Sequence, residues 1–170
     1  MHLQTFRIQV PLLGAVCLAA TSYGLVRVHM GDEMPRFLRE LAEAFPEAEV
    51  TGPGPVVRAA GKAIKSYLGG GPDPRVDVVL PEDGFSVRVW REIEKIPRGE
   101  SRSYARIAKA MRKPLAARAV GQACGRNPVP LVIPCHRVVA SNGAIGGFSS
   151  DLSYKRKLLE LEGVTLNGHA

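Results

Sequence analysis

The stretch from Ile8 to Val26 carries no charged residue, and this limits what the first part of the chain can fold into. Nineteen uncharged residues approach the length of a membrane-spanning helix. Pro11 and the turn-forming segment Thr21-Ser22-Tyr23-Gly24 interrupt the stretch, however, and no cationic cluster precedes it. We therefore interpret it as two strands, 15–20 and 25–30, joined by a turn, and expect no membrane association.

The rest of the first half has the pattern of a small α+β domain. Residues 35–45 and 56–68 each repeat apolar side chains at helical spacing, and residues 76–80 alternate weakly, as in a third strand. Residues 1–10 are either a strand or a ragged end. These elements predict helices on an antiparallel sheet, and nothing in this half indicates chemistry.

Charge is distributed unevenly between the two halves of the chain. Residues 1–85 hold 8 Lys+Arg and 10 Asp+Glu, whereas residues 86–170 hold 15 and 6, so the net charge changes from −2 to +9. A basic half favours a polyanion as its partner, although a generally basic surface would give the same balance. Three irregularly spaced cysteines predict a reducing compartment, and neither they nor the four histidines form an evident metal-ligand set.

The second half begins with signals for three helices. Residues 85–96 repeat apolar side chains at helical spacing, Ser103 is a plausible N-cap for a helix over 104–111, and Pro114 is placed to open a helix over 115–124. Two short helices joined by a tight turn resemble a helix-turn-helix. In the second of them Arg118 is the only long basic side chain among small residues, which suits either close approach to DNA or ordinary packing.

The remaining segments are a mostly apolar run, a turn, a loop and a last helix. Residues 129–139 predict a buried strand or an irregular segment, because two prolines interrupt them. Residues 141–143 predict a turn and 146–151 a flexible loop. The helix over 152–162, capped by Gly163, is expected to bury Leu158, Leu159 and Leu161 and to expose Lys155, Arg156 and Lys157.

The run Ile133-Pro134-Cys135-His136-Arg137-Val138-Val139 contains the strongest candidate for chemistry. A thiol is a poor nucleophile and a thiolate a good one, so a reactive cysteine needs a base or a positive charge nearby. His136 can supply the base, and Arg137 adds positive potential. A buried Pro-Cys-His segment also fits plain core packing, so these residues alone leave both readings open.

Several short motifs, taken together, resemble the O6-alkylguanine-DNA alkyltransferases, also called methylated-DNA–protein-cysteine methyltransferases. The resemblance covers about residues 85–163, and residues 1–80 match only in layout. It implies an α+β protein with a ribonuclease-H-like domain over 1–80 and a mostly helical, winged-helix-like domain over 81–170. The motifs are Ser103-Tyr104, Ile107-Ala108, Arg118-Ala119-Val120-Gly121, Asn127-Pro128, Pro134-Cys135-His136-Arg137-Val138, Gly146-Gly147-Phe148 and Glu162-Gly163.

The resemblance implies direct-reversal DNA repair in a single turnover. The alkyl group of O6-alkylguanine, or as a second candidate O4-alkylthymine, would pass irreversibly to Cys135 after the base is flipped out of the duplex. His136 would take the thiol proton through a bridging water, Glu162 would orient the imidazole, and Tyr104 would donate a proton or hydrogen bond to the base. No cofactor is implied.

Further residues acquire roles from the same resemblance. Arg118 would fill the gap left by the flipped base, with Ala116, Ala117 and Gly121 lying close to the minor groove and Ser141 also contacting DNA. Asn127 would brace the active-site turn, while Val138, Phe148 and Ser149 would contact the base. Phe148 stands where a tyrosine is common, and Asp151 places a negative charge near the pocket rim.

The expected partner is double-stranded DNA with an alkylated guanine, bound by a monomer without a metal. The expected location is the cytoplasm, with association to the nucleoid if the source is a prokaryote. One alternative is a non-catalytic protein that binds alkyl lesions in DNA, but such proteins lack the cysteine present here. The other is an unrelated cysteine enzyme, such as a hydrolase or thiol oxidoreductase. The absence of a second cysteine at redox spacing opposes it.

Overall fold

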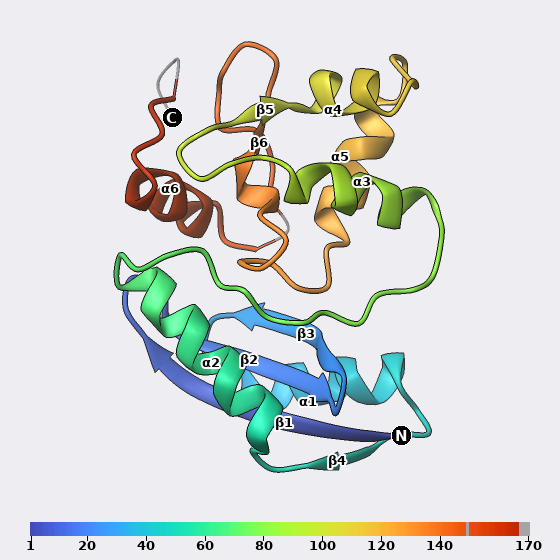
Figure 1. Cartoon of the computed structure of the whole chain (residues 1–170), viewed down its shortest axis with the longest axis vertical. Coiled ribbons are helices and arrows are strands. Elements are labelled where there is room, and N and C mark those ends of the chain that lie inside the picture. Colours follow the sequence, from blue (N-terminus) through green and yellow to red (C-terminus); the bar gives the residue numbers. More distant parts are fainter. Residues whose placement is uncertain (149, 167–170) are drawn as a thin grey trace. The chain divides into compact units, whose positions relative to one another are not determined.

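The structure, a computed structural model of the 170-residue chain, describes residues 1–148 and 150–166 (Figure 1). It divides into two compact units, Met1–Leu80 and Pro81–Ala170. Within the described residues, no helix combines the length and apolar character needed to cross a membrane. The helices are α1 (Met34–Ala44), α2 (Pro55–Leu68), α3 (Phe85–Glu94), α4 (Tyr104–Ala110), α5 (Ala117–Gly125) and α6 (Leu152–Leu161), with a 3-10 turn, η1, at Cys135–Arg137.

A four-stranded sheet forms the centre of the first unit. Its strands are ordered β3 (Gly24–Met30), β2 (Gly14–Thr21), β1 (His2–Val10) and β4 (Glu49–Thr51). β2 pairs antiparallel with both β1 and β3, and the short β4 pairs parallel with β1 at the edge. The two predicted strands are therefore confirmed, and residues 2–10 are a strand rather than a ragged end.

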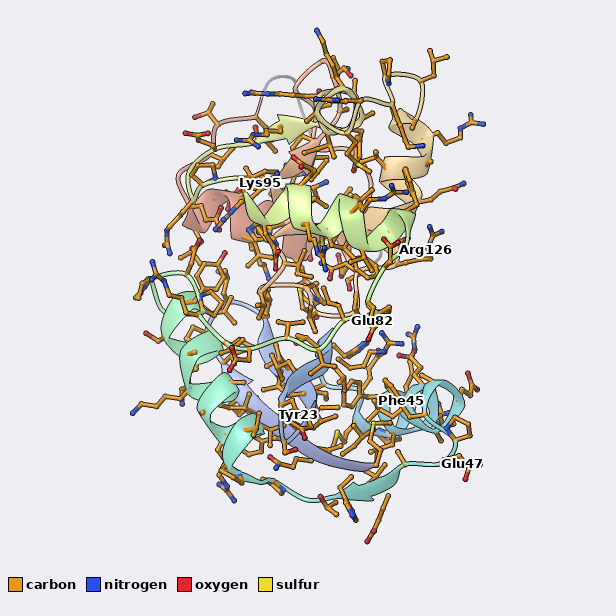
Figure 2. The ribbon with its side chains drawn as sticks, turned by 45° about the vertical axis from the view of Figure 1, so that its right-hand side comes forward. Tyr23, Phe45, Glu47, Glu82, Lys95 and Arg126 are labelled. Carbon is orange, nitrogen blue, oxygen red and sulfur yellow. The ribbon has the colours of Figure 1, made fainter. Side chains whose placement is uncertain are left out.

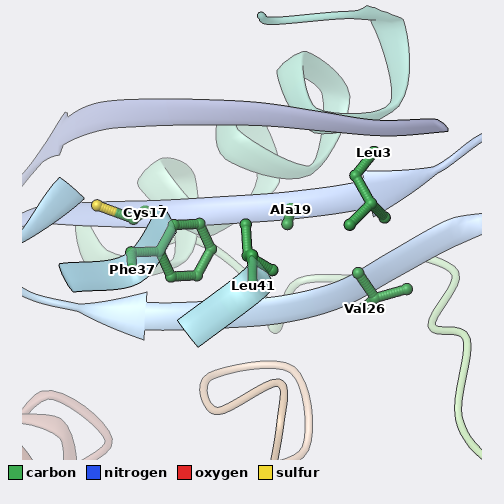
Figure 3. Packing of buried hydrophobic residues seen from close by; sticks show 6 residues of the cluster. All are labelled: Leu3, Cys17, Ala19, Val26, Phe37 and Leu41. Atoms are coloured by element: carbon green, nitrogen blue, oxygen red, sulfur yellow. The ribbon is translucent and has the colours of Figure 1, made fainter. Parts of the chain in front are cut away.

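The central strand β2 is buried on both faces of the sheet, which explains the uncharged sequence. On one face, Cys17 and Ala19 belong to a cluster with Phe37 and Leu41 of α1, in which Cys17 lies beside Phe37 (Figure 3). On the other, Gly61 of α2 lies against the side chain of Leu18. Since every residue of β2 from Ala15 onward is buried, a charge anywhere along it would have to leave water.

The third strand predicted at residues 76–80 does not form. Val78 makes only an isolated parallel bridge to Leu25, with Leu25 N donating to Asp77 O and Val79 N donating to Leu25 O at 2.9 and 2.8 Å. Prolines at 72, 74 and 81 flank the segment, and a proline has no amide hydrogen for a sheet ladder. The segment therefore continues as irregular backbone.

In the second unit, side chains join the helices around the short parallel pair β5 (Arg102–Ser103) and β6 (Val138–Val139). Trp90 of α3 donates its indole hydrogen to Ala123 O of α5 at 2.8 Å, within the core. Arg126, at the end of α5 (Figure 2), donates to Ser86 Oγ at 3.1 Å. These bonds fix α5 against α3.

Local chemistry sets where α4 and α5 begin. Ser103 is the N-cap predicted for α4, and its Oγ accepts from Arg106 N at 3.0 Å. α5 begins at residue 117 instead of 115, because Pro114 occupies a turn in which Ala116 N donates to Lys113 O at 2.9 Å. Proline is favoured at the second position of such a turn. Leu115 consequently stands 99% exposed beside the helix start.

The apolar run 129–139 is mostly irregular and contains η1 and β6. The turn predicted at 141–143 is present, with Gly143 N donating to Ala140 O at 2.9 Å. α6 follows, with Asp151 as its N-cap: Asp151 Oδ1 accepts from Ser153 N at 2.8 Å. Burial of Leu158 and Leu159 is confirmed, whereas Leu161 is only half-buried.

Candidate active site

Cys135 lies in a turn that hydrogen bonds hold in a fixed shape. Its amide donates to Ile133 O at 2.8 Å, and Asn127 Nδ2 donates to the same carbonyl at 2.8 Å. Asn127 Oδ1 in turn accepts from Val129 N at 3.0 Å. With both ends of its amide engaged, Asn127 ties the start of the apolar run to the residues just before Cys135.

A buried charged cluster stands directly after the cysteine in sequence. His136 Nε2 lies 2.9 Å from Glu162 Oε1, and Arg137 binds both carboxylate oxygens of Glu162, at 2.7 and 2.9 Å. Arg137 also donates to Ile96 O at 2.9 Å. Because Glu162 accepts from Nε2–H, the lone pair of a neutral imidazole is on Nδ1.

Burial sets the resting protonation of the cysteine and the histidine. It lowers the pKa of His136 against the opposing effect of Glu162, with Arg137 lowering it further. Burial raises the pKa of the Cys135 thiol, whereas Asn127 and Lys155 lower it. At neutral pH the site therefore holds a neutral imidazole, which is the form that can accept a thiol proton.

A pocket of about 640 Å³ has Cys135 in its wall. Of the predicted site residues, the structure brings six more to this wall, whereas His136 and Glu162 lie in the protein interior. Asn127, Val138 and Ala116 are also outside the lining, and Ser149 lies outside the described residues. The six are Tyr104, Ala117, Arg118, Gly121, Ser141 and Phe148; the lining residues that the sequence did not single out include Ala105, Gln122, Cys124 and Gly147.

Tyr104 presents a protonated phenol to the pocket. Its hydroxyl donates to Gly147 O at 3.3 Å, and burial raises its pKa to about 12. Gly146 makes this approach possible, since it has φ +73° and a Cβ there would stand 3.0 Å from the phenol oxygen. The phenol therefore remains a proton donor throughout the physiological range.

The expectation that Lys155 is exposed is wrong. The side chain is fully buried, and Nζ donates to Val138 O at 2.7 Å and to Gly147 O at 2.8 Å. Nζ also lies 3.5 Å from the Tyr104 hydroxyl and within 6 Å of the ring centres of Tyr104 and Phe148. Burial lowers the pKa of Lys155 to about 8. Backbone carbonyls from distant segments compensate the buried charge, and the sequence of α6 alone does not reveal them.

Exposed basic side chains occur on α4, on the turn that follows it and on α5. Arg118 is exposed at the pocket wall. Asp151, expected to place a charge near the rim, caps α6 through its carboxylate, and the bond from Ser153 N lowers its pKa. The other exposed basic residues between the start of α4 and the end of α5 are Arg106, Lys109, Arg112, Lys113 and Arg126.

In the described part of the chain, no group of three or more His, Cys, Asp or Glu side chains is placed to hold a metal ion. Cys17, Cys124 and Cys135 are all free thiols and all buried.

Fold and site together define a class of α+β protein in which a buried cysteine, followed by a histidine–glutamate pair in the interior, stands in the wall of a pocket beside two helices that carry exposed basic side chains. The family model described as 6-O-methylguanine DNA methyltransferase, DNA binding domain, matches residues 84–164. A methylated-DNA–protein-cysteine methyltransferase of Methanosarcina acetivorans is 36% identical over 153 residues, which are 89% of this chain and 93% of that protein. The chain belongs to the methylated-DNA–protein-cysteine methyltransferase family.

Solved structures share this architecture. The crystal structure of Mycobacterium tuberculosis O6-methylguanine methyltransferase matches with a TM-score of 0.77 at 32% identity, covering 94% of this chain and 92% of that one. The crystal structure of Mycobacterium tuberculosis OGT in complex with DNA matches with a TM-score of 0.77, at 32% identity and 95% and 92% coverage. The likeness extends through both units of the chain, and the predicted α+β class is confirmed.

Proposed function

We propose that this chain repairs DNA by moving the alkyl group of O6-alkylguanine onto its own Cys135. The observation that carries the proposal is the place of Cys135 in the wall of a 640 Å³ pocket, with the His136–Glu162 pair buried behind it. Membership of a family of methylated-DNA–protein-cysteine methyltransferases supplies the substrate and the acceptor atom. The reaction restores guanine without excising it.

The basic unit would present the lesion to this pocket. We assign α4 and α5 to a helix-turn-helix whose second helix enters the minor groove. Ala116, Ala117 and Gly121 have small side chains, so the helix can approach the DNA closely, and Ser141 would add a contact from the pocket rim. The exposed Arg118 is long enough to occupy the space that the flipped base leaves in the stack.

The residues of the site supply both the proton acceptor and the proton donor that the transfer step needs. His136 takes the Cys135 proton through a bridging water, and Glu162 stabilises the imidazolium that results. Sγ then forms a bond to the alkyl carbon while the bond from that carbon to guanine O6 breaks and its electron pair passes to the base. The phenol of Tyr104 donates a proton to the departing guanine, so the base does not leave as an anion. The thioether is stable, so each molecule reacts once.

Other parts of the proposal follow from the same assignment. Phe148 would form a wall of the base pocket, with Val138 and Ser149 contributing backbone contacts and Asn127 bracing the turn. Units 1–80 and 81–170 would be the ribonuclease-H-like domain and the DNA-binding, alkyl-transfer domain. We further propose a cytoplasmic monomer, which would be nucleoid-associated if the source is a prokaryote. Its free cysteines fit a reducing compartment.

Intact mass after mixing with a duplex that carries one O6-methylguanine tests the proposal. We expect one added methyl group per protein, located by peptide mapping on Cys135, and no addition to Cys135→Ser. Cys124→Ser is the matched control, because it removes another thiol from the same pocket wall. A duplex with O4-methylthymine tests the second substrate. Tight binding to the lesion without any added mass would overturn the proposal in favour of a non-catalytic lesion-binding protein.

A further inference from the structure

The buried amine of Lys155 has the hydrogen-bond environment of an ammonium ion. An ammonium has three donors and no acceptor, and Nζ faces three oxygen atoms: the carbonyls of Val138 and Gly147, at 2.7 and 2.8 Å, and the phenol of Tyr104, at 3.5 Å. The faces of two aromatic rings, of Tyr104 and Phe148, also lie within reach of the charge. Together these contacts hold one positive charge at a defined point behind the pocket wall.

Among the residues that the structure describes, no hydrogen bond or ion pair joins a carboxylate to this ammonium. The buried carboxylate of the described residues, Glu162, is bound by Arg137 and His136. Tyr104 and Gly147, which hold Nζ, line the same pocket as two thiols, Cys135 and Cys124. A negative charge on either thiol would raise the pKa of Lys155. A buried cation without an anionic partner is costly, so the structure contains an ammonium whose natural counter-charge is a thiolate.

We infer that the Lys155 ammonium stabilises the Cys135 thiolate, and that its bonds to Val138, Gly147 and Tyr104 fix it in the position where it does so. Lys155 is thus a positioning residue, which acts through the charge on Sγ and touches neither base nor alkyl group. It also lies beside the phenol that gives up a proton when guanine departs. The inference deepens the proposed function, because it concerns the same cysteine.

The charged and titratable groups around Lys155 come from three other elements. Tyr104 belongs to α4, Cys124 to α5, and Cys135 and His136 to η1. The ammonium lowers the pKa of both Cys135 and His136. Loss of the ammonium would therefore make the thiolate harder to form and His136 easier to protonate, and a thiol titration can detect the first effect.

The test follows the reaction of Cys135 with iodoacetamide against pH, read as carboxamidomethylation of the Cys135 peptide. In Lys155→Met we expect the rate at neutral pH to fall about tenfold or more, since an opposite charge nearby commonly changes thiolate formation by that factor. The midpoint of the pH–rate curve should move to higher pH. Lys155→Arg keeps the charge and should retain the midpoint, and Lys157→Met, exposed on the same helix, should match the wild type.

A merely structural role for Lys155 would change access to Cys135, and hence the plateau rate, without moving the midpoint. An unmoved midpoint in folded Lys155→Met would overturn the inference. If that variant does not fold, the wild type provides the measurement, because coupling between two charges is reciprocal. The Lys155 titration, followed by NMR, should then move to lower pH once Cys135 is carboxamidomethylated, and an unmoved titration would overturn the inference. Neither readout uses DNA, so failure here is distinguishable from failure of alkyl transfer.

Discussion

Arg137 binds both carboxylate oxygens of Glu162 inside the protein, and one of those oxygens is also the partner of His136. Glu162 follows the last residue of α6, whereas Arg137 ends the 3-10 turn that carries the cysteine. The pair therefore attaches the end of one helix to the reactive turn. It holds the carboxylate where the imidazole needs it.

Replacing Glu162 with glutamine should lower both stability and transfer. The change leaves the guanidinium of Arg137 buried without its carboxylate, which commonly costs about 3–5 kcal/mol of unfolding free energy. The imidazolium of His136 also loses its stabilising charge, so methyl transfer should slow. Urea unfolding and single-turnover transfer measure the two effects. Glu160→Gln, exposed on the same helix, should change neither, and an equal loss in that control would refute the assignment.

The pH dependence of methyl transfer should be bell-shaped. The proton passes from Cys135 to His136 within the site, so the competent protein carries a neutral imidazole and, by our inference, a charged Lys155. Burial lowers the pKa of His136, so the acid limb should lie below 6.5, the ordinary histidine value. The alkaline limb should fall near pH 8, where Lys155 loses its proton. Single-turnover rates across pH measure both limbs, and in Lys155→Arg the alkaline limb should disappear, because a guanidinium stays charged.

Arg118→Ala should slow repair in duplex DNA much more than in single strands. A single strand has no base stack to fill, so the side chain has little to contribute there. Arg88→Ala is the matched control, since it removes the same charge from an exposed position on α3, outside the pocket wall. Methyl transfer rates of both variants on duplex and single-stranded substrates test the role of Arg118. Equal losses on duplex and single strand would rule out the gap-filling role.

Gly146→Ala should impair the site, whereas Gly147→Ala should be tolerated. At Gly146 the backbone has φ +73°, and a Cβ would crowd the Tyr104 hydroxyl at 3.0 Å. A Cβ at Gly147 meets nothing within 4 Å. We expect the first change to cost about 1–2 kcal/mol of stability and to slow transfer, by strain at a left-handed position and by displacing the phenol. Thermal unfolding and transfer rates of the two variants provide the comparison, and identical behaviour would contradict it.

Local sequence predicted the site where its residues are consecutive or form a cap. Cys135 and His136 are neighbours in the chain, and the N-cap at Ser103 depends on a residue only three positions away. The partnership of His136 with Glu162 spans 26 residues and could be expected only from the family resemblance. That resemblance also pointed to Arg118 and Tyr104, which the structure places at one pocket.

Lys155 shows why other features could not be predicted. Within α6 it stands in a run of three basic residues, a pattern typical of a solvated helix face. Its burial depends on carbonyl groups at Val138 and Gly147, and backbone groups leave no trace in side-chain periodicity. The irregular path of residues 76–80 has a similar origin, because its single bridge is to Leu25 of β3, which is distant in the sequence.

The low exposure of Cys135 bears on how long the protein survives in the cell. In the proposed reaction each protein molecule reacts once. Earlier reaction of Cys135 with a peroxide or an unrelated electrophile would therefore inactivate the protein before it reached DNA. The side chain is only 4% exposed, and burial keeps its thiol in the less reactive protonated form. The amount of active protein would then fall with the number of lesions repaired and not with the rate at which cellular oxidants and electrophiles are produced.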